Sequence, residues 1–291
     1  MFQIALLGCE NSHADAFLSM LAEGKFPDMT AVGIYSVEAE AAQKLHEKYG
    51  TPIMERFDEL VGKVDGILVT ARDGKYHYPY AKPYLASGIP MFIDKPITCD
   101  GKEAVAFLRE AKAHGVRLCG GSSCIYLKDT IAFAEEVQKG EAGPYGRVMG
   151  ASVCAPIQMQ SVYGGFYFYA QHLVQIMMRV FGDEILAVSA HFGTDYAAWI
   201  ARYKDYDITA SYSGAGWYYH ISLYGSKACK SADLDFTPDV YEVELAHMHD
   251  LLLGKEMPQS YDALIRPVFV LNAIEKATKS GKWEPVEIQT V

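Results

Sequence analysis

The fold is decided by the stretch FQIALLGCENSHA, residues 2–14, and by the way its pattern continues. A short apolar run over 2–7 stops at Gly8, which predicts a buried strand. The residues after it predict a helix over 14–22 with Ser12 as its N-cap. The stretch therefore predicts a strand, a tight turn and a helix in immediate succession.

The same alternation of strand and helix continues outward as far as residue 121. Further strands are predicted over 30–35, 66–70, 91–93 and 116–119, and further helices over 38–49, 78–87 and 103–114. Parallel neighbours need a crossover, and a helix is the usual one, so this order predicts a doubly wound parallel sheet. A ligand is then expected beyond the carboxyl ends of the strands, after Leu7, Tyr35, Thr70 and Ile93.

Beyond residue 127 the pattern changes to consecutive strands. Strand-like runs fall at 148–155, 185–192, 197–203, 207–213, 217–224 and 228–234, and helices are predicted over 129–139, 165–181, 240–253 and 261–280. Successive strands without intervening helices indicate an antiparallel sheet. The predicted class is α/β plus α+β, with a doubly wound parallel sheet in a domain at 1–121 and a mixed or antiparallel sheet in a domain at 122–291.

Composition excludes several classes of function. The 291 residues carry 26 Lys and Arg against 36 Asp and Glu, a formal net charge of −10, and no basic cluster stands out. This charge argues against a nucleic-acid partner or an anionic membrane surface, since both reward clustered cations. No uninterrupted apolar stretch approaches the ~20 residues of a membrane span, and the six cysteines form no Cys-x-x-Cys pair. We therefore expect a cytoplasmic protein with reduced thiols.

The turn after the first strand departs from the glycine motif of dinucleotide-binding proteins. That motif, G-x-G-x-x-G, would place glycines at 8, 10 and 13, and only Gly8 is present. Glu10 stands where the backbone approaches the pyrophosphate, and a carboxylate ~5 Å from a phosphate at an effective dielectric of ~20 costs about 3 kcal/mol unless it lies in solvent. After the second strand, Tyr35 and Ser36 stand where an acid would select NAD, and no Arg follows to bind a 2′-phosphate. The turn alone leaves open whether it binds a cofactor, and which one.

Two side chains are candidates for catalysis. Lys95 follows a strand at the ligand side of the sheet, where Pro96 fixes the direction of the chain. His172 lies on a predicted helix, and Tyr169 and Gln175 share its face. Taken alone, a salt-bridged edge lysine and a hydrogen-bonded packing histidine are the commoner interpretations of these two residues.

Two other features are expected to be structural. His247 and His249 diverge by ~200° around a helix and cannot share an ion, so we expect no metal site. Cys9 has no basic group placed to lower its pKa, so we expect a small buried hydrophobic side chain rather than a nucleophile.

Around Lys95 and His172 the chain resembles the Gfo/Idh/MocA family, the sugar and cyclitol dehydrogenases named for glucose-fructose oxidoreductase and inositol dehydrogenase. Members carry Glu-Lys-Pro after the fourth strand, and Asp94-Lys95-Pro96 matches it with a conservative change. Thr70 and His77 match the ends of the family's Thr-Pro-Asn-x-x-His stretch, but Ala71-Arg72-Asp73 replaces its middle and two further residues follow Asp73.

The resemblance extends into the second half of the chain. The family places Asp-x-x-x-His on a helix after a Gly-Gly pair, and the histidine is the proposed proton acceptor. Here Gly164-Gly165 and His172 are kept, but Phe168 stands in the Asp position. Tyr169 or Gln175 would then replace the lost carboxylate as the polar partner of His172.

The resemblance implies an NAD(P)-dependent oxidoreductase acting on a carbohydrate or cyclic polyol, with a Rossmann domain for the dinucleotide and a second domain for substrate and assembly. It implies that Lys95 orients the reacting hydroxyl and that His172 takes its proton, the two facing each other across one cleft. The implied cofactor-binding residues are Gly8, Asn11, Ser12, His13, Ser36, Thr70, Arg72, His77, Asp94 and Lys95. The implied substrate-binding residues are Tyr126, Tyr169 and Gln175. NAD and NADP both stay open as the cofactor, and Arg72 either reaches the pyrophosphate or pairs with Asp73.

Two other functions stay open because of the departures at Glu10, Ser36 and Phe168. One is a regulatory protein that binds nucleotide or sugar without catalysis. The other is an enzyme that reduces and reoxidises a tightly held NAD during epimerisation or glycoside cleavage. The family also implies a homo-oligomer, a dimer or tetramer, through the C-terminal sheet, and we expect Trp217 to Tyr219 on a sheet face buried in that oligomer.

Overall fold

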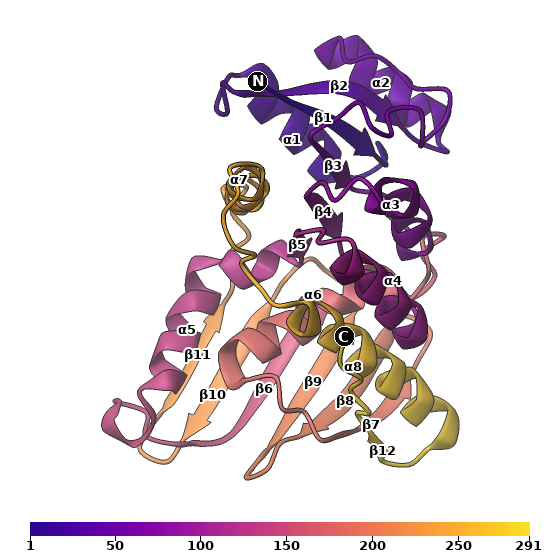
Figure 1. Ribbon diagram of the computed structural model, residues 1–291. Helices are drawn as coiled ribbons and strands as arrows, with labels where there is room; N and C mark the ends of the chain where they lie inside the picture. The colour runs from indigo at the N-terminus through magenta and orange to yellow at the C-terminus, as the bar shows by residue number, and fades with distance from the viewer. The chain divides into compact units, whose positions relative to one another are not determined.

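The computed structural model of the protein describes residues 1–291 and divides into two compact units. Unit 1 comprises Met1–Gly121, Pro238–Ile265 and Thr290–Val291, and unit 2 comprises Ser122–Thr237 and Arg266–Gln289. The division predicted after residue 121 coincides with the end of the first segment, but the chain later returns to unit 1 with helix α7 (Val240–Leu252). Each unit contains a sheet of its own (Figure 1).

Unit 1 contains a five-stranded parallel sheet in the order β2-β1-β3-β4-β5. Its strands are β1 (Phe2–Leu7), β2 (Met29–Tyr35), β3 (Gly66–Val69), β4 (Met91–Asp94) and β5 (Leu118–Gly121), and its crossover helices are α1 (Ser12–Ala22), α2 (Ala39–Tyr49), α3 (His77–Leu85) and α4 (Gly101–Ala113). The predicted doubly wound sheet is confirmed. The strand order reverses between β1 and β3, and the carboxyl ends at such a switch point form the expected ligand crevice.

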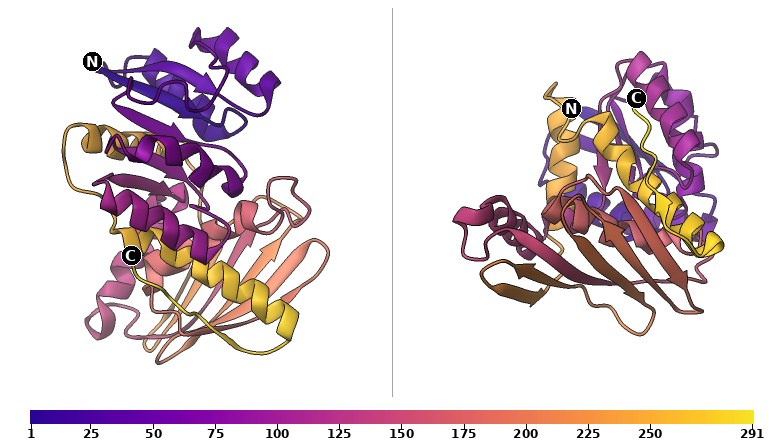
Figure 2. Two further views of the ribbon diagram at one scale, coloured as in Figure 1. Left: turned by 45° about the vertical axis from the view of Figure 1, so that its right-hand side comes forward. Right: turned by 90° about the horizontal axis from the view of Figure 1, so that it is seen from below.

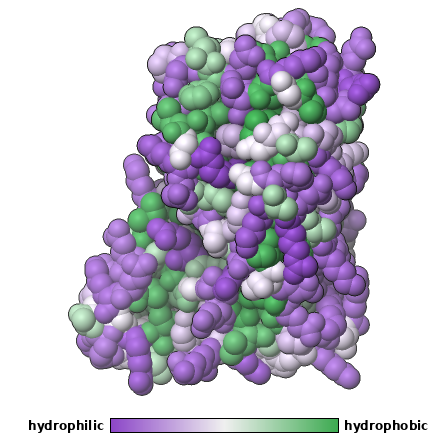
Figure 3. All heavy atoms as spheres, in the orientation of Figure 1, coloured by the Kyte–Doolittle hydropathy of each residue, from purple (hydrophilic) through white to green (hydrophobic).

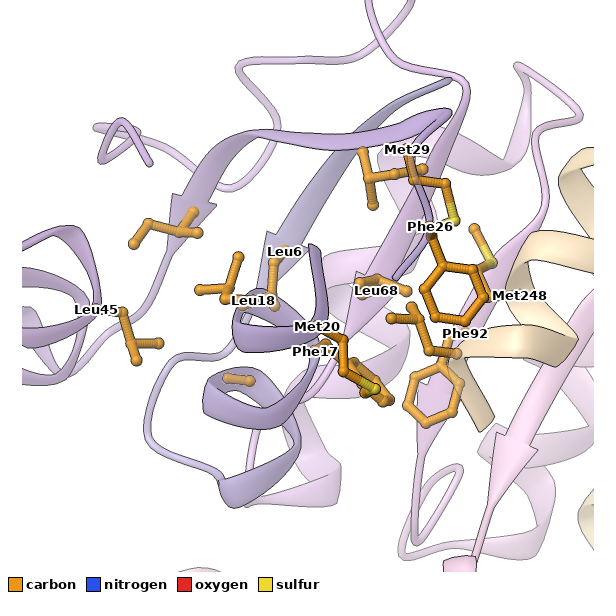
Figure 4. Packing of buried hydrophobic residues seen from close by; sticks show 14 of the residues in the cluster. Leu6, Phe17, Leu18, Met20, Phe26, Met29, Leu45, Leu68, Phe92 and Met248 are labelled. Atoms are coloured by element: carbon orange, nitrogen blue, oxygen red, sulfur yellow. The ribbon is translucent and has the colours of Figure 1, made fainter. Parts of the chain in front are cut away.

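The core of unit 1 joins helices α1 and α7 to the sheet. Phe17 of α1 packs edge-to-face on Phe92 of β4, with ring centroids 5.1 Å apart. Met248 of α7 belongs to the same cluster and is fully buried (Figure 4). Helix α7 buries Leu245, Met248 and Leu251, whose helical spacing forms one apolar stripe. This stripe explains why a segment far along the chain completes the first unit.

Unit 2 contains a seven-stranded sheet in the order β11-β10-β6-β9-β8-β7-β12. Its strands are β6 (Val148–Pro156), β7 (Ala187–Phe192), β8 (Tyr196–Arg202), β9 (Asp207–Ser213), β10 (His220–Gly225), β11 (Cys229–Asp233) and β12 (Glu284–Pro285). Strands β6 and β9 pair in parallel and the other neighbours are antiparallel, so the predicted mixed or antiparallel sheet is confirmed.

The helices of unit 2 lie on one face of this sheet (Figure 2). They are α5 (Lys128–Gln138), α6 (Tyr167–Phe181) and the part of α8 (Tyr261–Ser280) beyond residue 265, with the short 3₁₀ turns η2 (Ser123–Tyr126) and η3 (Gly140–Ala142). Strands β8 and β9 alternate buried and exposed side chains, as a sheet covered on one face requires. Tyr212 of β9 points inward and donates a 2.6 Å hydrogen bond to the carbonyl oxygen of Ala170 in α6.

One predicted strand begins later than expected. The run predicted over 217–224 becomes β10 only from His220, and residues 217–219 form the loop after β9. The expectation that Trp217 to Tyr219 lie on a sheet face was therefore wrong. The indole of Trp217 instead packs edge-to-face on Tyr169, with ring centroids 4.9 Å apart.

Hydrophilic side chains cover most of the surface visible in Figure 3. None of the helices combines the length with the hydropathy that crossing a bilayer requires.

Candidate functional site

The turn between β1 and α1 admits only glycine at its first position. Gly8 has φ +107°, and a Cβ atom there would lie 2.1 Å from the backbone nitrogen of Ala71. The hydroxyl of Thr70 donates a 2.6 Å hydrogen bond to the carbonyl oxygen of Gly8. Thr70 therefore holds the turn after β1 against the chain that leaves β3.

Asn11, rather than Ser12, is the N-cap of α1. Its backbone is extended and its side-chain oxygen accepts the backbone N–H of His13 at 3.4 Å, so the prediction of Ser12 as the cap was wrong. The hydroxyl of Ser12 lies 3.1 Å from that of Tyr241 on α7. The backbone N–H groups of Glu10, Asn11 and Ser12 donate to no protein acceptor, and they stand at the positive end of the helix dipole. A tight glycine turn that leaves N–H groups free at a helix start fits the pyrophosphate of a dinucleotide.

The Glu10 carboxylate is held by the protein. Its Oε2 accepts the Ser36 hydroxyl at 2.6 Å, and its Oε1 accepts the backbone N–H of Arg72 at 3.0 Å. Asp73, which the sequence suggested as a partner for Arg72, forms an ion pair with Lys75 at 2.7 Å. The neighbouring Cys9 is buried, as expected, and burial together with Glu10 raises the pKa of its thiol to about 12.

Asp94, at the end of β4, is fully buried and bound by three neighbouring groups. Its Oδ1 accepts the backbone N–H of Lys95 at 2.6 Å, and its Oδ2 accepts the side-chain amide of Asn11 at 2.5 Å and lies 3.2 Å from Nδ1 of His13. These bonds fix the start of the Asp94-Lys95-Pro96 segment, whose Lys95–Pro96 peptide bond is cis. The side chain of Lys95 is itself buried.

His13 occupies the third glycine position of the motif and bridges two carboxylates. Its Nε2 lies 3.0 Å from Oε2 of Glu244 on α7, on the opposite side of the ring from Asp94. Both His13 and Glu244 are at most 3% exposed. Burial by itself would lower the pKa of His13, but the adjacent carboxylates of Asp94 and Glu244 raise it above its ordinary value. Burial raises the pKa of Glu244 in turn, against the opposing effect of His13.

His77 holds two loops of unit 1 together. It is fully buried, and its ring nitrogens lie 2.6 Å from the carbonyl oxygen of Pro96 and 2.7 Å from that of Ala71. Burial lowers the pKa of His77, and a neutral ring donates its single N–H to one of these carbonyls at a time. His77 thus ties the chain after β3 to the Lys-Pro segment after β4.

In unit 2, His172 lies on α6 and is buried against the start of that unit. Its Nδ1 is 2.6 Å from the hydroxyl of Ser122, and the backbone N–H of Ser122 donates to Oε1 of Gln175 at 2.7 Å. The nearest polar neighbour of His172 is Ser122, and the thiol of Cys124 lies 3.5 Å from the same Nδ1. Sequence reasoning missed both residues, and Gln175 contacts Ser122 rather than the Nδ1 of His172. Phe168, in the family's Asp position, is buried.

Two tyrosine rings flank His172 within unit 2. The rings of Tyr169 and Tyr219 have centroids 5.6 Å and 6.4 Å from that of His172, and Trp217 packs on Tyr169. Trp217 is 65% exposed, which gives this group an open aromatic edge. Tyr126, the third predicted substrate contact, lies in η2 and is half-buried.

The structure thus gathers the predicted residues into one group in each unit. In unit 1, the residues at the carboxyl ends of β1 to β4 are Gly8, Asn11, Ser12, His13, Ser36, Thr70, Arg72, His77, Asp94 and Lys95. In unit 2, His172 lies with Tyr169 and Gln175 on α6.

The segment that contains the unit 1 residues matches a known protein family. Residues 2–122 match the model of the Gfo/Idh/MocA family, described as an oxidoreductase family with an NAD-binding Rossmann fold. The resemblance drawn from the sequence is confirmed over this part of the chain, which is similar to the NAD-binding Rossmann domain of that oxidoreductase family. No curated protein matches the sequence at a significant level.

The whole chain has the fold of several solved structures at low sequence identity. Myo-inositol 2-dehydrogenase from Lactobacillus plantarum matches with a TM-score of 0.85 at 12% identity, over 98% of this chain and 99% of that one. A myo-inositol dehydrogenase from Corynebacterium glutamicum matches at 0.80 and 18% identity, over 99% of each chain. GenD2 from gentamicin A biosynthesis, crystallised with NAD, matches at 0.83 and 15% identity, over 98% of this chain and 96% of that one. These likenesses show that both units have the fold of such dehydrogenases.

Proposed function

We propose that the protein transfers a hydride between a nicotinamide dinucleotide and a hydroxyl-bearing carbon of a sugar or cyclic polyol. The observation that carries this proposal is the arrangement at the carboxyl ends of β1 and β4. There, a glycine turn with free N–H groups precedes a helix whose N-cap, Asn11, also binds the carboxylate next to Lys95. One residue thus couples the dinucleotide turn to the candidate catalytic lysine.

The residues of the chain would divide the chemistry as follows. When bound, the nicotinamide would supply the group that accepts or returns the hydride. The Lys95 ammonium would orient the reacting hydroxyl and stabilise negative charge that develops on its oxygen. His172 would take the hydroxyl proton at Nε2, because its Nδ1 faces the hydroxyl of Ser122. Asp94 would act by fixing the backbone of Lys95, since its two oxygens are already bonded within the protein.

We further propose that Tyr169 and Trp217 form the face on which the substrate ring rests beside His172. The two rings meet edge-to-face, and the indole is open to solvent. Aromatic faces offer apolar area of the kind that the C–H side of a sugar or cyclitol ring covers. Tyr126 and Gln175 remain predicted substrate contacts.

Titration with dinucleotides and then with candidate substrates tests the function. Isothermal calorimetry with NAD and NADP is expected to show saturable binding of one or both. Myo-inositol and a panel of aldoses, added with the dinucleotide that binds, are expected to produce net NADH or NADPH for at least one compound. Absence of binding for both dinucleotides would favour the silent regulatory protein, whereas binding with product formation but no net reduced dinucleotide would indicate an internal redox cycle.

We propose that the uncovered face of the unit 2 sheet joins copies of this chain into a dimer or tetramer. A shallow hollow of about 470 Å³ lies on this sheet, and small uncharged side chains dominate its lining. They include Ser152, Ser189, Ala198, Thr209 and Ser211. The lining contains no Asp, Glu, Lys or Arg, so packing a second copy against it would bury no carboxylate, ammonium or guanidinium group.

Light scattering after gel filtration tests the assembly. The wild-type chain is expected to elute as a dimer or tetramer, and Ser211→Arg, which places a charge in the middle of this face, is expected to give monomers. Ser87→Arg puts the same charge on an exposed turn of unit 1 and should leave the assembly unchanged. A monomeric wild-type protein would contradict the proposal.

A further inference from the structure

The carboxylate of Glu10 lies where three neighbouring strands of unit 1 end. Glu10 itself follows β1, its partner Ser36 follows β2, and its partner Arg72 follows β3. The order β2-β1-β3 makes these strands adjacent, so the two hydrogen bonds hold the carboxylate across the switch point of the sheet. The side chain is half-buried rather than extended into solvent.

The hydroxyl of Ser36 is fixed in its role toward Glu10. It accepts the backbone N–H of Glu38 at 3.1 Å and donates its single proton to the carboxylate at 2.6 Å. Ser36 therefore positions Glu10 and has no second proton to donate to a ligand. Each oxygen of the Glu10 carboxylate uses one acceptor site in the protein and keeps another, because an ionised carboxylate has about four such sites.

This arrangement gives two departures from the dinucleotide motif a common explanation. The chain has an acid in place of the second glycine and lacks an acid after the second strand. The side chain of Glu10 reaches from the turn to the end of the second strand, where its Oε2 lies 2.6 Å from the hydroxyl oxygen of Ser36. In dinucleotide-binding sheets an acid at this place accepts the hydrogen bond of the adenosine ribose 2′-hydroxyl.

We propose that Glu10 is the ribose-binding acid of this protein and makes it select NAD over NADP. The inference rests on the proposed function and adds its dinucleotide preference. A free 2′-hydroxyl donates to the carboxylate, whereas a 2′-phosphate brings like charge and acceptor oxygens against it. The competing outcome, binding of a 2′-phosphate by the guanidinium of Arg72, would give the opposite preference.

Fluorescence titration with NADH and NADPH measures this preference directly. We expect the wild-type protein to bind NADH at least about tenfold more tightly than NADPH. Glu10→Gln, which keeps the shape and removes the charge, should weaken NADH binding about ten- to hundredfold, the range for losing one hydrogen bond to a charged group, and should narrow the preference. Glu38→Gln is the matched control, because this exposed acid is two residues from Ser36 and caps nothing with its side chain. Glu38→Gln removes the same charge at a nearby position and should leave the ratio of the NADH and NADPH affinities unchanged.

The outcomes separate this inference from the function on which it rests. Equal binding of both dinucleotides, tighter binding of NADPH, or an unchanged ratio in Glu10→Gln would overturn the role of Glu10 and leave the oxidoreductase proposal standing. If Glu38→Gln changed the ratio of the NADH and NADPH affinities as much as Glu10→Gln does, the effect would come from general surface charge. That result would likewise overturn the role of Glu10 in binding the ribose. Binding of neither dinucleotide by the wild-type protein would overturn both proposals.

Discussion

Replacing Lys95 with methionine, or His172 with alanine, is expected to lower kcat by about two to three orders of magnitude while the protein stays folded. Loss of one group that stabilises charge on oxygen costs about 10²–10³-fold, and loss of a general base about 10²–10⁴-fold. Methionine keeps the aliphatic stem of the buried lysine, so the packing of the loop after β4 is preserved. Steady-state kinetics with the substrate found by titration measures the effect, and a thermal melt checks the fold.

The double variant tests whether the two residues act on one hydroxyl. When two groups serve the same chemical step, removing both costs less than their separate effects predict. The combined variant Lys95→Met and His172→Ala should therefore lower kcat by far less than the product of the two single fold-losses. Lys102→Ala removes an exposed lysine at the start of α4 and serves as the control with unchanged kinetics. Ordinary kinetics in both single variants would end the assignment of Lys95 and His172.

The second large effect is expected on stability, from His13→Ala. This change removes the imidazole between Asp94 and Glu244 and leaves the Glu244 carboxyl buried without its partner. Removing one member of a buried ion pair costs about 3–5 kcal/mol, and urea denaturation is expected to show a loss of that size. His46→Ala removes a histidine whose Nδ1 lies 2.9 Å from a backbone oxygen on the surface of the same unit, and should cost only about 1 kcal/mol.

A double-mutant cycle and a pH series separate the ion pair from simple packing. Combining His13→Ala with Glu244→Gln leaves no unpaired carboxylate on α7, so the double variant should lose less than the sum of the single losses. The pKa of His13 is raised in the folded protein, so its stabilisation is full below the ordinary pKa of histidine, ~6.5, and is lost as the pH rises through the raised value. The stability difference between wild type and His13→Ala should therefore shrink toward alkaline pH. Additive losses and a difference independent of pH would indicate that His13 only fills space.

The sequence predicted the strands of both sheets except the two-residue β12, because their signals are local. The apolar run before Gly8 and the alternation in 207–213 identify strands without knowledge of their neighbours. The N-cap was misassigned because Asn11 and Ser12 are both good capping residues, and only the backbone conformation decides between them. Trp217 was placed on a strand because aromatic residues favour strands, whereas packing on Tyr169 holds it in a loop.

The partners within the candidate site depend on contacts between distant segments, and these the sequence does not show. Glu244 lies in a run with several polar residues and has the appearance of a solvent-facing acid, yet it is buried against His13 from more than two hundred positions away. Ser122 has no motif that marks it as the neighbour of His172. One signal was present: a histidine in place of a packed glycine needs a buried partner, and residue 13 therefore pointed to an acid elsewhere in the chain.

The return of α7 to the first unit has a consequence for how the protein is made on the ribosome. Leu245, Met248 and Leu251 have no exposed surface and share a cluster with Phe17 near the amino terminus. The part of unit 1 that precedes residue 122 is therefore translated before the helix that covers its apolar cluster. The core of this part is complete only after α7 has been translated, so its folding is tied to the synthesis of a distant segment of the chain.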